Sequence, residues 1–211
     1  MAIITISRGT FIGGVCVAES VSEKLGYRCI AREELIKSAA RCYGLSEEKL
    51  TAAIDEPLTL SNKWNICQYI TCLRATLFRE LAQGNVVYHG HAGHLLLQGV
   101  PNLLNVRIIE SKESRIRFLI EQKDLTLEES IQYIKYEDEQ ATKWTRFVYD
   151  VDWGDSSSYD LVINIGRIDV RDACELIINA AKLDKYKDTP ETRKILNNLI
   201  LAYPRSMAFC S

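Results

Sequence analysis

The chain has 211 residues, of which 47% are hydrophobic and 26% charged, so it can bury one sizeable core. Its formal net charge is −2, which provides no global positive field for nucleic acid or for an anionic membrane. Neither is expected as a partner. The longest apolar stretch, around residues 95–109, is interrupted by Gly99, Pro101 and Asn102, so no membrane-spanning segment is expected.

The cysteines and the N-terminus indicate the cytoplasm. The seven cysteines are odd in number and none has C-x-x-C spacing, which favours reduced thiols over a disulfide framework. The first residues enter an apolar strand without a preceding basic region, so no signal peptide is expected. We therefore expect a cytoplasmic protein.

Short β-rich runs alternate with longer helical patterns, which predicts an α/β protein with a mostly parallel sheet covered by helices. Right-handed crossovers then place the carboxyl ends of the strands at one edge of the sheet, where ligands of such folds bind. Strands are predicted at 3–6, 27–30, 85–89, 104–109 and 161–165. Helices are predicted at 14–25, 32–43, 60–82, 112–121, 127–149 and 170–183.

Start signals support three of the predicted helices. Thr126 and Glu129 have the spacing of a capping box. Ser111 precedes a helical run, with Ser114 as the alternative cap, and Asp169 precedes the helix predicted at 170–183.

The C-terminal stretch differs from the rest in composition. Residues 184–193 are polar and are predicted to form a linker, and residues 194–203 have the pattern of one more amphipathic helix, ended by Pro204. Such a helix either packs back on the core of this chain, or packs against a partner, or begins an additional domain over residues 194–211. The sequence leaves these alternatives open.

A glycine-rich turn follows the first strand at once. Gly9 and Gly14 have the G-x-x-x-x-G spacing of a phosphate-binding P-loop. Glycine is needed there because backbone N–H groups curl round an anion with φ values that a side chain would forbid, and the following helix adds its positive N-terminal dipole. The alternative is a plain strand-to-helix turn. The expected phosphate-binding residues are Gly9, Thr10, Phe11, Ile12, Gly13, Gly14, Val15 and Cys16.

The end of this loop departs from a working P-loop. A lysine for the β- and γ-phosphates and then a Ser or Thr for Mg²⁺ are expected there, but the chain has Val15 and Cys16. Valine supplies no charge, and a thiol is a poor magnesium ligand. A lost charge-assisted hydrogen bond costs about 1.5–3 kcal/mol. Arg8, just before the loop, is the candidate substitute, and binding is expected to survive better than catalysis.

The three histidines, His89, His91 and His94, form an H-x-H-x-x-H pattern. One interpretation is a metal site. The favoured interpretation is that they line an acceptor pocket, where imidazole can hydrogen-bond phosphate. No carboxylate or thiol has ligand spacing to them, so no metal is expected.

Several blocks of sequence, in a constant order between residues 3 and 183, form a wider pattern. They are I-T-I-S-R-G at 4–9 with Gly13-Gly14, A-E-x-x-x-E-K-L-G-Y at 18–27, A-R-E-E-L-I at 31–36, V-V-Y-H-G-H-A-G-H at 86–94, P-N-L-L-N-V-R-I-I at 101–109, D-W-G-D at 152–155 and Y-D-L-V-I-N at 159–164. Together they resemble the cytidylate kinase-like family, a branch of the P-loop nucleoside monophosphate kinases.

This resemblance implies a three-layer P-loop fold over residues 1–183, with a parallel five-stranded sheet, a helical monophosphate-binding region and a lid. It implies phosphate transfer from ATP, with Mg²⁺, to a nucleoside monophosphate. The donor phosphates would face residues 9–16. The candidate catalytic residues are Arg8, Lys143 and Arg146, the last two as lid cations. The candidate substrate-binding residues are Arg32, His89, Gly90, His91 and His94.

The chain lacks cations at several positions where such kinases carry them. Val15 replaces the P-loop lysine, His91 stands where arginine is typical, and Ala141 and Thr142 occupy lid positions at which relatives often have arginine. Because phosphoryl transfer depends on positioning and cationic stabilisation, these losses weaken catalysis. Three functions therefore remain open: a nucleotide-binding kinase, a catalytically impaired, pseudokinase-like regulatory or interaction protein, and, less favoured, an unrelated anion-binding protein with no nucleotide preference. A homodimer through the C-terminal helix is one form of the second.

Two further groups are assigned to ordinary structural roles. Arg115 and Arg117 are expected on a solvated helix face. Trp144, Tyr149 and Trp153 are expected to pack in the interior rather than to stack on a base.

Overall fold

The structure is a computed structural model of the chain that describes residues 2–8, 12–55, 63–90 and 92–203. Its five-stranded sheet has the order β2-β3-β1-β4-β5, and every pairing is parallel. The strands are β1 (Ile3–Arg8), β2 (Arg28–Ala31), β3 (Val86–Gly90), β4 (Leu103–Ile109) and β5 (Leu161–Asn164). The predicted parallel α/β fold is therefore confirmed.

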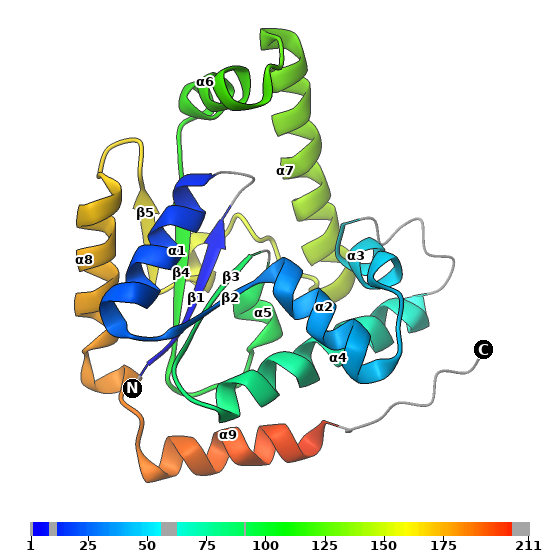
Figure 1. Cartoon of the computed structure of the whole chain (residues 1–211), viewed down its shortest axis with the longest axis vertical. Helices are drawn as coiled ribbons and strands as arrows, with labels where there is room; N and C mark the ends of the chain where they lie inside the picture. Colours follow the sequence, from blue (N-terminus) through cyan, green and yellow to red (C-terminus); the bar gives the residue numbers. More distant parts are fainter. Residues whose placement is uncertain (1, 9–11, 56–62, 91, 204–211) are drawn as a thin grey trace.

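Helices cover both faces of the sheet, and α6 and α7 project beyond its carboxyl edge (Figure 1). None of the described helices is long and apolar enough to cross a membrane. The α-helices are α1 (Ile12–Leu25), α2 (Arg32–Tyr43), α3 (Glu47–Asp55), α4 (Lys63–Ala82), α5 (Gly93–Leu96), α6 (Lys112–Lys123), α7 (Leu127–Tyr149), α8 (Val170–Ala181) and α9 (Pro190–Ala202). Two 3₁₀ turns, η1 (Ser156–Ser158) and η2 (Asp184–Tyr186), complete the described elements.

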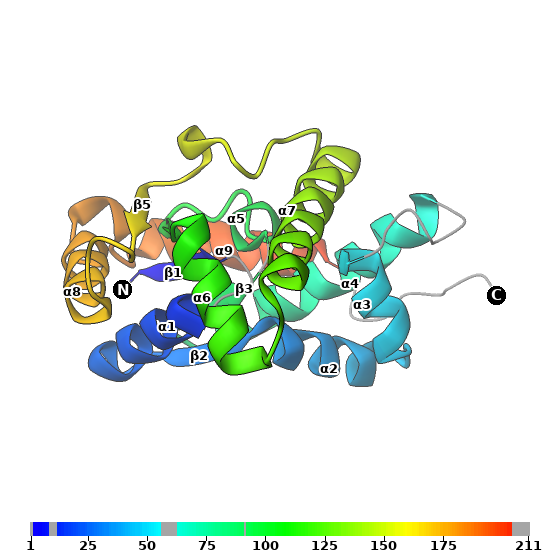
Figure 2. The same cartoon turned by 90° about the horizontal axis from the view of Figure 1, so that it is seen from above.

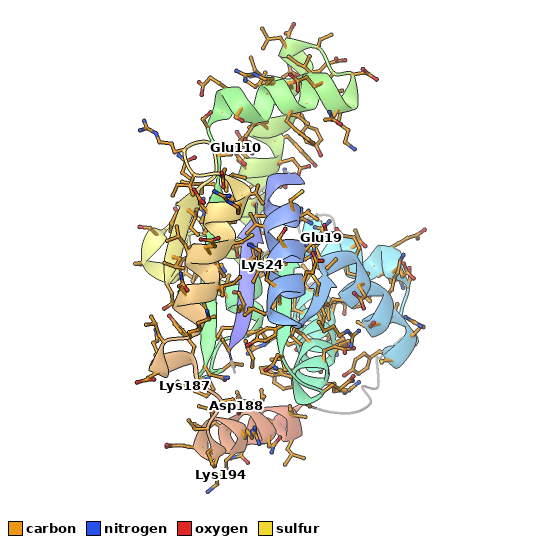
Figure 3. The ribbon with its side chains drawn as sticks, turned by 60° about the vertical axis from the view of Figure 1, so that its left-hand side comes forward. Glu19, Lys24, Glu110, Lys187, Asp188 and Lys194 are labelled. Carbon is orange, nitrogen blue, oxygen red and sulfur yellow. The ribbon has the colours of Figure 1, made fainter. Side chains whose placement is uncertain are left out.

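The alternation of side chains along β1 divides the core into two layers. Ile4 and Ile6 are buried in a cluster with residues of α1 and α8, whereas Ile3 lies in the cluster that contains α2, α4 and α5. Successive strand residues point to opposite faces, so Arg8 continues the α1 face and Ser7 the α5 face. The outer side of α1 is exposed and carries Glu19 and Lys24 (Figure 3).

The start signals in the sequence are confirmed. Thr126 and Glu129 form a full capping box. Ser111 accepts a hydrogen bond from the Ser114 N–H at 3.2 Å, and Asp169 accepts one from the Asp172 N–H at 2.8 Å. Each side chain satisfies a backbone donor that the helix itself leaves without a partner.

Helices α6 and α7 form a hairpin that projects beyond the carboxyl edge of the sheet (Figure 1). Seen from above, it crosses over the middle of the molecule (Figure 2). The base of α7 is fixed, because the Trp144 side chain is buried and its Nε1–H donates to the Ala53 carbonyl of α3 at 2.7 Å. The prediction that Trp144 packs in the interior is thus confirmed.

The C-terminal helix α9 packs back on α4. Tyr203, just after α9, stacks on Phe78 of α4 with ring centroids 5.1 Å apart, and Leu199 packs against the same core cluster. The helix begins at Pro190, earlier than predicted, because Thr189 and Thr192 form a capping box and proline is well placed in a first turn. The polar connection is correspondingly shorter than the predicted 184–193.

Truncating the packed face of α9 should destabilise the whole domain. Leu199→Ala is expected to lower the free energy of unfolding by about 1–2 kcal/mol, since it removes part-buried apolar contacts with the core cluster. Urea titration followed by circular dichroism measures this change. The control Leu201→Ala, at a side chain that is 79% exposed on the same helix, should change it by less than about 0.5 kcal/mol. Equal effects of the two substitutions would show that α9 is not docked as described.

Candidate functional site

Part of the predicted phosphate loop lies outside the described residues, namely Gly9, Thr10 and Phe11, and so does His91. The structure describes what flanks them. On one side are Arg8, at the end of β1, and the first turn of α1, which carries Val15 and Cys16 half-buried. On the other side is Gly90, the last residue of β3.

Arg8 lies directly over the first turn of α1. A Cβ atom added at Gly14 would stand 2.6 Å from the Arg8 Cβ and 3.1 Å from its Cδ. Glycine at position 14 is therefore required for the arginine stem to cross the helix start, which is a packing reason additional to the backbone freedom that a P-loop needs. A strand end, a helix N-terminus and a guanidinium thus meet at one point.

The Arg8 guanidinium reaches from α1 toward the neighbouring strand and helix. Its Nε donates to the Nδ1 of His89 on β3 at 3.2 Å. Burial lowers the pKa of Arg8, the charge of Glu33 opposes this, and the nearby charge of Arg32 adds to the lowering. Arginine nevertheless stays charged at any physiological pH. The site therefore holds a partly desolvated permanent cation, which binds an anion more strongly than a fully hydrated one does.

The start of α2 lies on the other side of the candidate site, opposite the first turn of α1. Its N-cap residue, Ala31, offers no side-chain cap, and Arg32 Nε lies 3.4 Å from the carboxylate of Glu33. Although burial opposes it, a backbone hydrogen bond and the charges of Arg32 and Arg8 hold the pKa of Glu33 below its ordinary value. The N-terminal dipole of α2 adds further positive potential here.

Gly90 lets the end of β3 approach α2. Its φ is +155°, and an added Cβ would stand 2.9 Å from the Arg32 Cβ and 3.1 Å from the Tyr88 hydroxyl. The Tyr88 hydroxyl is buried without a hydrogen-bond partner among the described residues. The structure thus brings together Arg8, Arg32, His89 and Gly90 from the predicted set.

His94 belongs to a different environment. It lies on α5, where its Nδ1 is 3.4 Å from the Ser7 hydroxyl and its ring packs on Tyr159 at 4.6 Å. Burial, with the charge of Arg107, lowers its pKa to about 4. Ser7 and Arg8 point to opposite faces of β1, so His94 and His89 lie on opposite sides of the sheet. Among the described residues, no group of His, Cys, Asp or Glu is arranged to hold a metal ion.

A cavity of about 550 Å³ lies on the α6–α7 hairpin. Glu110, in the link from β4 to α6, marks the base of the hairpin (Figure 3). The cavity is lined by Lys112, Arg115, Ile134, Lys135, Asp138, Glu139, Thr142, Lys143 and Arg146. The two predicted lid cations therefore face the same space, with further cations from α6.

Acidic neighbours hold the cations of this cavity. Lys143 lies 3.7 Å from Glu139, and Arg146 lies 3.3 Å from Asp152. Arg115 makes a bidentate pair with Asp138 at 2.7 and 2.6 Å. The expectation that Arg115 lies on a solvated face is therefore wrong, because its side chain is only 14% exposed and joins α6 to α7. The sequence of one helix does not reveal that a charged side chain pairs with the next helix.

The parallel sheet order, the helices on both of its faces and the α6–α7 hairpin define an α/β protein with the three-layer fold of the P-loop kinases. The cytidylate kinase-like family model matches residues 3–167. The chain belongs to this family.

Curated relatives match nearly the whole chain. It is 28% identical to the cytidylate kinase of Archaeoglobus fulgidus over 189 residues, covering 87% of this chain and 97% of the relative. It is 26% identical to the cytidylate kinase of Methanothrix thermoacetophila over 182 residues, covering 85% and 98%.

Solved structures show the same fold at low sequence identity. An uncharacterized protein from Eubacterium ventriosum matches with a TM-score of 0.67 and 22% identity, covering 85% of this chain and 97% of the other. Shikimate kinase from Bacteroides thetaiotaomicron matches with a TM-score of 0.54 and 12% identity, covering 86% and 99%.

The buried histidines should make stability depend on pH. The folded-state pKa values of His89 and His94 are lowered to about 4, so the unfolded chain binds protons more readily as the pH falls below the ordinary histidine value. The contribution of the neutral histidines to the free energy of unfolding is therefore fully present above about pH 7 and is lost as the pH falls toward 4. Each histidine should remove about 2 kcal/mol from the free energy of unfolding between pH 7 and pH 5.

Urea unfolding of the wild type and of His94→Asn at both pH values measures this dependence. The variant should lose about 2 kcal/mol less than the wild type over the same interval. An identical pH dependence of the two proteins would contradict a neutral, buried His94.

Proposed function

We propose that this protein binds a nucleotide through its phosphate groups, at the junction of β1, α1 and α2. The observation that carries the proposal is the packing of the Arg8 stem over Gly14, with its guanidinium hydrogen-bonded to His89 and in electrostatic contact with Arg32 and Glu33 at the start of α2. Two helix N-termini and two arginines, Arg8 and Arg32, converge there, and such an arrangement favours an anion. The glycine spacing of residues 9–14 supports the same assignment.

The hairpin supplies the second half of the proposed site. Lys143 and Arg146 face a cavity large enough for part of a nucleotide, and closure of the hairpin would narrow this cavity around a bound phosphate. Closure of a lid expels water, which strengthens each charge contact and suppresses hydrolysis. The acidic partners Glu139 and Asp152 must then release these cations or share them with the ligand.

The reaction supported best is phosphate transfer from ATP to a nucleoside monophosphate. Its support is membership of the family and the two relatives named cytidylate kinase. ATP would supply the transferable phosphate, with Arg8 and Arg32 orienting phosphate oxygens. Mg²⁺ fits less well, since Cys16 stands where a hydroxyl would meet the metal and thiols bind hard cations poorly. No step is therefore assigned to the metal.

The second candidate is a nucleotide-binding protein with weak or absent turnover. Val15 and Ala141 favour it, because both replace cations that would stabilise the transferred phosphate. Arg8 supplies one positive charge near the P-loop, but the charge enters from the strand rather than from the helix. Binding of ground-state phosphate is less sensitive to that geometry than catalysis is.

Removing the Arg8 charge should weaken phosphate binding. Arg8→Gln is expected to raise the Kd for ADP about tenfold or more, as the loss of a charge-assisted hydrogen bond predicts. Isothermal titration calorimetry measures the change. Arg41→Gln removes the same charge from an exposed position near the far end of α2 and should leave the Kd unchanged. Equal affinities of wild type and Arg8→Gln would contradict the site.

Restoring the P-loop lysine distinguishes the two candidate functions. Val15→Lys places a cation in the first turn of α1 and is expected to raise turnover of CMP with ATP at least tenfold if the remaining site is intact. A coupled assay of ADP release, with Val15→Met as the uncharged control of similar length, measures it. Ordinary kinase turnover by the wild type would remove the impaired-kinase interpretation.

A further inference from the structure

We propose that His89 is a positioning residue that holds the Arg8 guanidinium over the start of α1, where it stands in for the absent P-loop lysine. This inference rests on the proposed phosphate site. It assigns His89 a role different from direct contact with an acceptor. The imidazole acts as a hydrogen-bond acceptor toward the protein's own cation.

The sheet places the two residues side by side on one face. In the register of β1 with β3, Ile6 pairs with His89 and Ser7 with Gly90. Ile6 and Val87 both lie in the core cluster beneath α1, and Arg8 and His89 each follow two positions later. Side chains two apart along a strand share a face. Arg8 and His89 therefore meet at the carboxyl edge, on the side where α1 begins.

The contact determines the direction of the guanidinium. The Arg8 Nε–H donates to His89 Nδ1 at 3.2 Å, while the stem is confined by its contact with Gly14. This hydrogen bond does not occupy either Nη group, so the two terminal nitrogens can still make a bidentate contact with a phosphate. A long side chain that is held at its stem and at Nε loses less freedom when it binds an anion.

The same contact fixes the chemical state of His89. Nδ1 can accept only when it carries no proton, so the ring is neutral with its proton on Nε2. Burial and the charge of Arg8 lower the His89 pKa to about 4, against the opposing charges of Glu33 and Glu34. His89 is only 4% exposed. A ring in this state contributes no positive charge to a phosphate, but it does orient the cation that contributes one.

Two substitutions separate positioning from simple packing. Asn places its Oδ1 where histidine has Nδ1, so His89→Asn retains an acceptor for Arg8. Leu places a methyl group at that point, so His89→Leu removes it. We expect the Kd for ADP, measured by calorimetry on the full chain, to rise about tenfold in His89→Leu and less than about threefold in His89→Asn.

A double-mutant cycle and a spectroscopic measurement complete the test. The effects of Arg8→Gln and His89→Leu on the Kd for ADP should be non-additive, with the double variant binding ADP no more weakly than Arg8→Gln alone.

Nitrogen-15 NMR of the wild-type imidazoles, assigned with single His variants, should show His89 as the Nε2–H tautomer down to pH 5. This readout stands even where a variant folds poorly.

Each outcome has a defined meaning. Wild type that fails to bind ADP overturns the proposed function, and the positioning role with it. ADP binding that is unaffected by His89→Leu, or additive losses in the cycle, overturns only the positioning role. An Nδ1–H tautomer or an ordinary His89 pKa does the same. The inference is established if His89→Leu weakens ADP binding, His89→Asn retains it, and His89 has the expected Nε2–H tautomer.

Discussion

The site depends on the close approach of the Arg8 side chain to the first turn of α1, which only glycine at position 14 permits. That contact carries a permanent charge from the end of β1 across the helix N-terminus to His89 on the next strand. The charge is thereby partly removed from water, and desolvated cations attract phosphate more strongly than hydrated ones. Arg32, on the other side of the site, lies close to the end of β3 because Gly90 has no side chain to separate β3 from α2.

This arrangement differs from an ordinary P-loop in the origin of its charge. A P-loop lysine extends from the helix that follows the glycine turn, whereas Arg8 enters from the strand that precedes it. The N-terminal dipole of α1 is kept, and the cation is supplied from the other side. Such an exchange preserves attraction for a nucleotide phosphate more readily than the geometry of a transition state, where small displacements are costly. The proposed phosphate site therefore predicts that binding is retained more readily than turnover.

Patterns local in sequence predicted most of the fold. The strands were recognised because buried parallel strands are apolar and bounded by turn signals, and the cap of α7 followed from Thr126 and Glu129. Helices α3 and α5 were not predicted, since they have only 9 and 4 residues. The site was predictable only in part: Arg8 and Arg32 came from motif positions, whereas the Arg115–Asp138 pair and the separation of His94 from His89 depend on how distant elements pack.

The account depends on a nucleotide phosphate being held by the first turn of α1 and by Arg8. A crystal structure of the full chain grown with excess ADP tests this directly. The account predicts the β-phosphate within hydrogen-bonding distance of the Gly14 amide and of an Arg8 Nη group, with the Arg8–His89 contact retained. ADP bound at another place, or Arg8 turned away from a phosphate in the turn, would contradict it.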